Sequence, residues 1–237
     1  KERIALVTGA GKGTGRDIAL RLTGIAAAVA VHYHKDSRSA EGVASEIKRR
    51  GRKSGIFAAD LTDETQASNL IRTVEDEFGR IDILVNNIGP FLVKPWMELV
   101  SADWRHILDS NLLAPFFCMK AVLPGMRRRQ WGRIVNIGYS RAEQLAAFPS
   151  ITPYAAAKTS LLILTRTAAV AEAVSGVTVN MVSPGLIEGG VLPPLKNPEK
   201  IRLGQFSDVG EAVAFLASEK AGAISGTNII VAGTWKM

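Results

Sequence analysis

Seven short apolar segments, separated by longer segments with helical periodicity, constrain the fold of this chain more than any other feature. The apolar segments are 3–9, 28–34, 53–60, 80–87, 132–138, 176–185 and 227–233. Most are continuous runs of Val, Ile, Leu and Ala, which indicates strands buried on both faces. Such strands form parallel sheets whose right-handed crossover helices cover both faces. We therefore expect an α/β fold, a doubly wound seven-stranded parallel sheet with helices on both faces.

The expected helices alternate with these strands along the whole chain. They are 13–22, 39–50, 63–78, 102–126, 153–173 and 208–218. The chain has 237 residues and is 47% hydrophobic, enough for one large core. Because it contains no repeat, low-complexity tract or linker, we expect residues 1–237 to form a single domain.

The net charge of +7 raises nucleic-acid binding as an alternative class of function. The basic clusters 48–53 and 127–129 lie where helices are expected to end, however, and cations are favourable there. Aromatic interleaving and zinc-ligand spacing are absent from the sequence. We expect no nucleic-acid partner, and an anionic small ligand accounts for the charge.

A single cysteine, Cys118, excludes an internal disulfide and fits a reducing compartment, so we expect a cytoplasmic protein. Its apolar surroundings predict a buried thiol. The apolar runs fall short of the roughly 20 residues of a membrane span, so no membrane partner is expected. His32 and His34 alternate on a strand without further ligand residues, so we expect no metal site.

The segment 8–15, "TGAGKGTG", stands between the first strand and the first helix. Gly9, Gly13 and Gly15 allow a tight turn and close approach of a pyrophosphate, and the helix amino terminus supplies amide donors. Glycines alone are a weak signal, but their position at the first strand–helix turn indicates a dinucleotide site.

Five further motifs follow in order: "DLTD" at 60–63, "NNIG" at 86–89, "SNLLAPF" at 110–116, "YAAAK" at 154–158 and "VSPGLIE" at 182–188. With the glycine loop they resemble the short-chain dehydrogenase/reductase family, a Rossmann-fold family, over essentially the whole chain. Within it the chain looks most like the 3-oxoacyl-carrier-protein reductases. The resemblance implies a cofactor set of Gly9, Lys12, Gly13, Thr14, Gly15, Asp60, Leu61, Asn87, Ile88, Gly89, Tyr154, Lys158, Pro184, Gly185 and Ile187.

The end of the second strand, "VHYHKDSR", predicts which dinucleotide is bound. An acidic residue there favours NAD, whereas cations suit the 2′-phosphate of NADP. His34, Lys35 and Arg38 follow Tyr33, and Lys12 adds a cation from the glycine loop. We therefore expect NADP (NADPH), with Asp36 as the dissenting residue.

Tyr154 and Lys158 are four residues apart on an expected helix, hence neighbours on one face. A nearby ammonium and a cationic nicotinamide would lower the pKa of the phenol, which could then exchange a proton with a carbonyl or alcohol oxygen. The resemblance gives Tyr154 the proton transfer, Lys158 the nicotinamide ribose and Asn111 a water that relays protons. A redox-sensing regulator without catalysis is the alternative, and retention of the Tyr–Lys pair argues against it.

The family's active-site serine is displaced here. It usually follows the strand directly and precedes the Tyr by 13 residues, whereas this loop carries two extra residues and offers Tyr139 and Ser140. A donor is needed to stabilise charge on the substrate oxygen. Ser140 is the preferred candidate, with Tyr139 or neither residue as the alternatives.

The segment after the sixth strand, about 186–206, corresponds to the substrate lid. It is short and proline-rich, and Gly189 stands where the family commonly has a Thr. We expect carbonyl–alcohol interconversion, on a 3-oxoacyl thioester that could be carried by an acyl carrier protein, or on another small ketone, sugar, quinone or pteridine. Phe91, Leu145 and Phe148 are expected around the substrate. The resemblance also implies a homotetramer, with Trp235 near a subunit contact.

Overall fold

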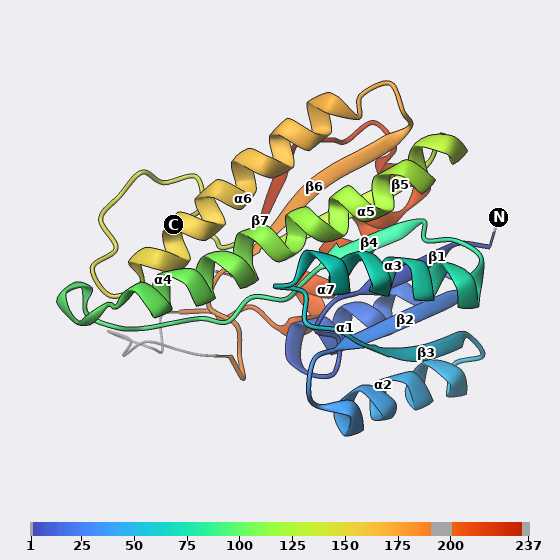
Figure 1. Cartoon of the computed structure of the whole chain (residues 1–237), viewed down its shortest axis with the longest axis horizontal. Coiled ribbons are helices and arrows are strands. Elements are labelled where there is room, and N and C mark those ends of the chain that lie inside the picture. The colour runs from blue at the N-terminus through green and yellow to red at the C-terminus, as the bar shows by residue number, and fades with distance from the viewer. Residues whose placement is uncertain (1, 191–200, 234–237) are drawn as a thin grey trace.

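The computed structural model describes residues 2–190 and 201–233, and its main feature is a seven-stranded parallel sheet (Figure 1). The strands lie in the order β3-β2-β1-β4-β5-β6-β7. Their bounds are β1 (Ile4–Val7), β2 (Ala28–Tyr33), β3 (Lys53–Ala58), β4 (Ile83–Asn86), β5 (Gly132–Ile137), β6 (Val177–Pro184) and β7 (Asn228–Val231). The expected doubly wound sheet is confirmed. Its order reverses between β1 and β4, where the loops after the two strands diverge and ligands bind in such sheets.

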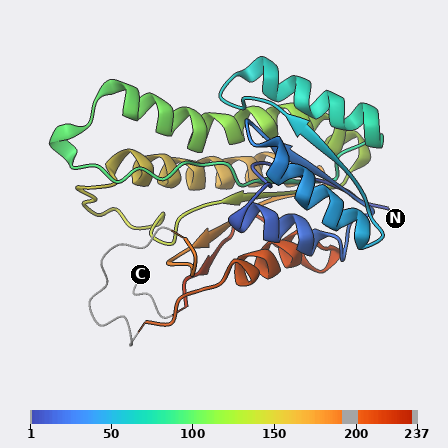
Figure 2. The same ribbon diagram turned by 90° about the horizontal axis from the view of Figure 1, so that it is seen from below.

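Helices cover both faces of the sheet (Figure 2). The helices are α1 (Gly13–Leu22), α2 (Ser37–Arg49), α3 (Glu64–Phe78), α4 (Ser101–Leu108), α5 (Ala114–Arg129), α6 (Thr152–Ala171) and α7 (Phe206–Ala217). One core joins α1, α2 and α7 to the sheet and includes Ala5 and Val7 of β1, whereas the other joins α3 and α5 and includes Leu6. Successive residues of one strand therefore enter opposite cores, which explains why the strand sequences are apolar without alternation.

The long helix expected at 102–126 is interrupted. Between α4 and α5 the chain forms a π-helical turn, η2 (Asp109–Leu113), and Asn111 lies at its centre. By length and composition alone, the combined run Ser101–Arg129 could cross a membrane. In the fold, however, Cys118, Val122 and Met126 of this run are fully buried against the sheet. The run therefore serves as a core helix, and the predicted buried thiol is confirmed, with burial raising the pKa of Cys118 to about 12.

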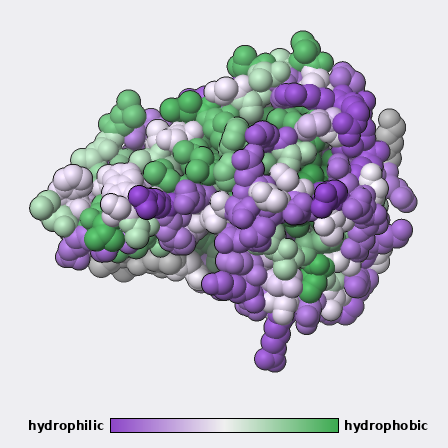
Figure 3. Space-filling view, viewed as in Figure 1, coloured by the Kyte–Doolittle hydropathy of each residue, from purple (hydrophilic) through white to green (hydrophobic). Residues whose placement is uncertain are grey.

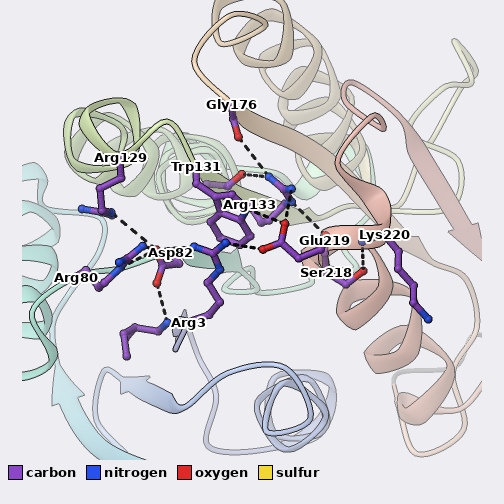
Figure 4. Close-up of polar contacts among 12 residues, drawn as sticks. Arg3, Arg80, Asp82, Arg129, Trp131, Arg133, Gly176, Ser218, Glu219 and Lys220 are labelled. Carbon is purple, nitrogen blue, oxygen red and sulfur yellow. Dashed lines mark hydrogen bonds and ion pairs between the residues drawn. The ribbon is translucent and has the colours of Figure 1, made fainter. Parts of the chain in front are cut away.

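A charged cluster closes the amino edge of the sheet, opposite the carboxyl ends that carry the sequence motifs (Figure 4). Asp82 is fully buried and accepts hydrogen bonds from the Ile4 backbone, 3.0 Å away, and from the Arg80 guanidinium. Arg3 and Arg129 lie 3.9 and 3.8 Å from the same carboxylate. The cluster ties β1, β4 and the end of α5 together at this edge.

Candidate active site

The glycine loop forms the turn between β1 and α1. Gly9 and Gly13 have φ angles of +61° and +54°, which L side chains rarely adopt. A Cβ on Gly15 would overlap the Gly9 carbonyl oxygen and the Asn87 amide. At the amino end of α1, Lys12 makes no capping hydrogen bond through its side chain. The first-turn amides of α1 are therefore left without a side-chain cap, as a phosphate-binding helix terminus requires.

Asn87 locks this loop to the end of β4. Its side-chain amide donates to the carbonyl oxygens of Thr8, 3.0 Å away, and Gly9, 3.1 Å away. In return, the Thr8 hydroxyl accepts from the backbone N–H groups of Asn87 and Ile88 at 2.9 and 3.2 Å. These hydrogen bonds hold together the loop after β1 and the loop after β4, the two strands between which the strand order reverses. Thr8 belongs to the quoted loop, but its locking role was not predicted.

Basic side chains of the glycine loop and of the segment after β2 lie near two carboxylates, those of Asp36 and Asp60. Asp36 caps α2: its carboxylate accepts from the Ser39 backbone at 3.0 Å and the Ser39 hydroxyl at 2.7 Å. These hydrogen bonds, and then the charges of Lys12 and Arg38, lower its pKa. Hydrogen bonds from Thr62, and then the charges of His34 and Lys35, lower the pKa of Asp60. The dissenting Asp36 thus has a structural role as a helix cap.

Asn111, Lys158 and Gly89 meet at one corner beyond β4. The Asn111 amide donates to the carbonyl oxygens of Pro90 and Ile107, both at 3.1 Å. A Cβ on Gly89 would overlap Asn111 Oδ1 and lie 3.1 Å from Lys158 Nζ, so these polar atoms flank the glycine. Asn111 Oδ1 is buried without a hydrogen-bond partner among the described residues. The corner therefore presents an unused acceptor beside an ammonium, as a site that holds a water or a cofactor hydroxyl would.

Tyr154 and Lys158 share one face of α6 as expected, with Nζ 5.8 Å from the phenol ring centroid. Lys158 Nζ donates to the Ile137 carbonyl oxygen at 2.7 Å, and burial lowers its pKa to about 7. Burial raises the pKa of Tyr154, and the nearby Tyr139 phenol adds to this. The expected lowering of the Tyr154 pKa is thus not seen in the protein alone. Desolvation outweighs the attraction of an ammonium that is itself partly discharged.

Aromatic rings surround the Tyr154 phenol. Phe91 meets Tyr154 edge to face at a centroid distance of 4.8 Å, and Tyr139 does so at 5.6 Å. Phe148 lies behind Tyr139 at 6.2 Å. Leu145, also expected here, is 96% exposed and lines, together with Phe148, a hollow of about 540 Å³ beside α6, and its place around the substrate stays a prediction.

The two candidates for the displaced serine differ in their surroundings. Ser140 is 2% exposed, and its hydroxyl is enclosed without a hydrogen-bond partner among the described residues. Its backbone N–H donates to the Pro184 carbonyl oxygen at 3.0 Å, which anchors the loop to β6. Tyr139 is half-buried, and its ring packs on Tyr154. The role of Ser140 stays a prediction, and of the two residues it is Tyr139 whose ring contacts the Tyr154 phenol.

The segment after β6 folds back on the chain that leads into α7. The Gly185 N–H donates to Val231 at 2.9 Å, and Ile187 is buried and pairs with Gly204. Gly189 has a φ of +78°, so a Thr in this conformation would be strained. Part of the expected lid, 191–200, lies outside the described residues, as does Trp235.

Two buried polar residues near the site make contacts that were not predicted. Asn136 is fully buried on β5, accepts from Asn86 at 2.8 Å and donates to Thr165 at 2.9 Å, which connects the strand ends to α6. His32 is also fully buried. Polar residues inside otherwise apolar strands were the available signal for both. Among the described residues, we find no group of His, Cys, Asp and Glu suited to a metal.

The fold and this set of side chains define a class of protein, the dinucleotide-dependent oxidoreductases. A glycine loop stands at the first turn of a doubly wound sheet, where dinucleotides bind in such folds. Beside it lie the Tyr154–Lys158 pair and Asn111, side chains of the types that exchange and relay protons.

Comparison with known proteins identifies the family. A model of the short chain dehydrogenase family matches residues 3–200. The 3-oxoacyl-acyl-carrier-protein reductase FabG of Staphylococcus aureus is 37% identical over 238 residues, covering 97% of this chain and 96% of that protein. A Sinorhizobium meliloti structure described as a short-chain alcohol dehydrogenase aligns with a TM-score of 0.91 at 32% identity, covering 98% of this chain and 96% of that one. An acetoin dehydrogenase from Enterobacter cloacae aligns at 0.88 and 28%, covering both chains fully at 100%. The chain belongs to the short-chain dehydrogenase family and is an oxidoreductase.

Proposed function

We propose that this enzyme reduces a carbonyl group to a secondary alcohol with NADPH, and that its substrate is a 3-oxoacyl thioester, which could be carried by an acyl carrier protein. The observation that carries the proposal is the meeting of Tyr154, Lys158 and Asn111 beside the glycine loop. The names of the similar reductases support the thioester. Another small ketone, including an acetoin-like one, is the alternative, which the acetoin dehydrogenase neighbour supports.

In this mechanism the dinucleotide supplies the hydride, and the chain supplies position and protons. Gly9, Gly13 and the amino end of α1 would hold the pyrophosphate. Lys158, buried and close to Asn111, would bind the nicotinamide ribose and pass a proton to Tyr154. The raised pKa of Tyr154 keeps the phenol neutral at pH 7, the form that donates a proton to a carbonyl oxygen.

A second donor to the substrate oxygen is proposed on the loop after β5. Tyr139 packs against Tyr154, whereas the Ser140 hydroxyl is enclosed. We assign the donor role to Tyr139 and the anchoring of the loop to Ser140, through its backbone bond to Pro184. This reverses the preference drawn from the sequence.

The choice of NADPH rests on charge. Lys12 and Arg38 act on Asp36, whose carboxylate is engaged by Ser39 at the start of α2. A 2′-phosphate placed there would meet Lys12 and Arg38 beside the Asp36 carboxylate, which already caps the amino terminus of α2. His34 and Lys35 add charge near Asp60.

We also propose a cytoplasmic homotetramer without a nucleic-acid or membrane partner. Ile163 and Val170 of α6 are 63% and 78% exposed, seven residues apart on one helix face, and Val174 beyond them is 91% exposed. Figure 3 shows apolar residues gathered over α5 and α6. A second copy of the chain would cover this face.

The test is oxidation of NADPH and of NADH, followed by absorbance, against 3-oxoacyl thioesters, acetoin-like ketones, sugars and quinones. We expect turnover of a 3-oxoacyl thioester with NADPH in preference to NADH. Tyr154→Phe should lower kcat by about 10² or more and leave the Kd of NADPH nearly unchanged, because it removes the proton donor. Undiminished turnover by Tyr154→Phe would refute the mechanism, and equal affinity for both cofactors would refute the NADPH assignment.

A further inference from the structure

A buried histidine lies under the glycine loop, near the carboxyl end of β2. His32 is fully buried, and it is one of three histidines in the chain. The Gly9 N–H donates to its Nδ1 at 3.1 Å, and its Nε2 lies 3.1 Å from the Ala59 carbonyl oxygen. Both ring nitrogens therefore have backbone partners.

These partners determine the state of the imidazole. A carbonyl oxygen only accepts hydrogen bonds, so Nε2 carries the proton and donates to Ala59. Nδ1 must then carry the lone pair that accepts from Gly9. The ring is neutral, and a second proton would place an N–H group against the Gly9 N–H.

The two backbone partners belong to different parts of the proposed nucleotide site. Gly9 begins the tight turn of the glycine loop with its φ of +61°. The next N–H, that of Ala10, donates to the His32 carbonyl oxygen at 2.9 Å, so side chain and backbone hold the loop together. Ala59 directly precedes Asp60 and Leu61, which the family resemblance places in the cofactor-binding set.

We propose that His32 is a positioning residue for the dinucleotide, whose neutral imidazole fixes the glycine loop and the Asp60–Leu61 segment at the spacing that the cofactor requires. The inference rests on the proposed function in one respect, namely that these two segments bind the same dinucleotide. It assigns His32 no contact with the cofactor.

The electrostatics of the site agree with a neutral His32 imidazole that bridges Gly9 and Ala59 through its two hydrogen bonds. Burial lowers the pKa of His32 to about 4, partly offset by the hydrogen bond to Ala59. His34 lowers this pKa and Asp60 raises it by smaller amounts, and these are the charged groups that act on the ring from the ends of β2 and β3. The bridge therefore persists at neutral pH and breaks in acid.

Three variants test separately the two hydrogen bonds of the His32 ring, here called the Gly9 arm and the Ala59 arm. His32→Leu removes both hydrogen bonds. His32→Asn places an amide oxygen near the Nδ1 position and keeps the Gly9 arm, whereas His32→Gln places an amide near the Nε2 position and keeps the Ala59 arm. His106→Asn, at an exposed site on α4, is the matched control.

The Kd of NADPH and of NADH, from cofactor fluorescence, is measured for each variant together with its Tm. We expect His32→Leu to weaken both cofactors about tenfold, the single-arm variants to recover part of this loss, and the control to match the unmodified protein. Imidazole ¹⁵N spectra should show a neutral Nε2–H ring that does not titrate between about pH 5 and pH 8. Exchange of the Gly9 amide should quicken in His32→Leu.

The outcomes separate this inference from the proposed function. If the unmodified protein binds dinucleotide and folded His32→Leu binds it equally well, the positioning role is overturned even if the Tm falls. A ring that titrates near pH 6.5 would also overturn it. If the unmodified protein bound neither dinucleotide, the proposed function would be overturned as well.

Discussion

Substitutions at two neighbouring residues, Tyr139 and Ser140, are expected to have opposite effects on kcat. Because the Ser140 hydroxyl is enclosed without a partner, Ser140→Ala should leave kcat within a few fold and raise stability by about 1 kcal/mol. Tyr139→Phe removes the proposed donor to the substrate oxygen and should cost about 10²–10³ in kcat. Steady-state kinetics and denaturant unfolding measure both effects. A large kcat loss in Ser140→Ala alone would return the role to the serine.

The buried Lys158 is expected to lower the free energy of unfolding at neutral pH. Its pKa falls to about 7 from 10.5, so between these values the unfolded chain binds a proton that the folded chain does not. Stability should therefore rise as pH increases from about 7 toward 10. Lys158→Met should abolish turnover, raise stability by about 0.5–2 kcal/mol at pH 7 and remove this pH dependence. Unfolding of the cofactor-free protein at several pH values is the measurement, and a less stable variant would contradict the expectation.

At the scale of elements, the amino edge of the sheet depends on Asp82. Its carboxylate has no exposed surface and faces the guanidinium groups of Arg3, Arg80 and Arg129. Asp82→Asn removes the carboxylate that Arg80 and Arg129 face, whereas Arg3 keeps its ion pair with Glu219, and should cost about 3–5 kcal/mol of unfolding free energy.

The matched control for this change is Lys120→Gln. It breaks an exposed ion pair with Glu64, 2.8 Å long, and should cost less than about 1 kcal/mol. Urea unfolding compares the two variants. Equal losses would show that the buried carboxylate is not the group that holds β1, β4 and α5 together.

For the whole molecule, the exposed face of α6 predicts assembly. Light scattering should give a tetramer at micromolar concentration, and Val170→Arg should yield smaller species because it places a charge in the proposed contact. Glu41→Arg reverses a charge on the exposed surface of α2 and should leave the assembly intact. A monomeric unmodified protein would refute the assembly.

Much of the fold was predictable because its signals are local. Continuous apolar strands, helical periodicity and the glycine spacing located every strand and placed Gly9, Gly13 and Gly15 at the first turn. Tyr154 and Lys158 were predictable as a pair since four residues bring two side chains onto one helix face.

Other features of the site depend on contacts between residues far apart in the chain. The π-helical turn at Asn111, the use of Asp36 as a cap and the bridge through His32 arise from backbone groups that only the fold brings near. Burial disfavours the charged form of each group, which raises the pKa of Tyr154 and lowers the pKa of Lys158. The sequence by itself determined the order of strands and helices and the residue types for the chemistry. Only the tertiary structure decided that the Tyr139 ring packs on Tyr154 while the Ser140 hydroxyl is enclosed, because contacts and solvation are set by the packing of the whole molecule.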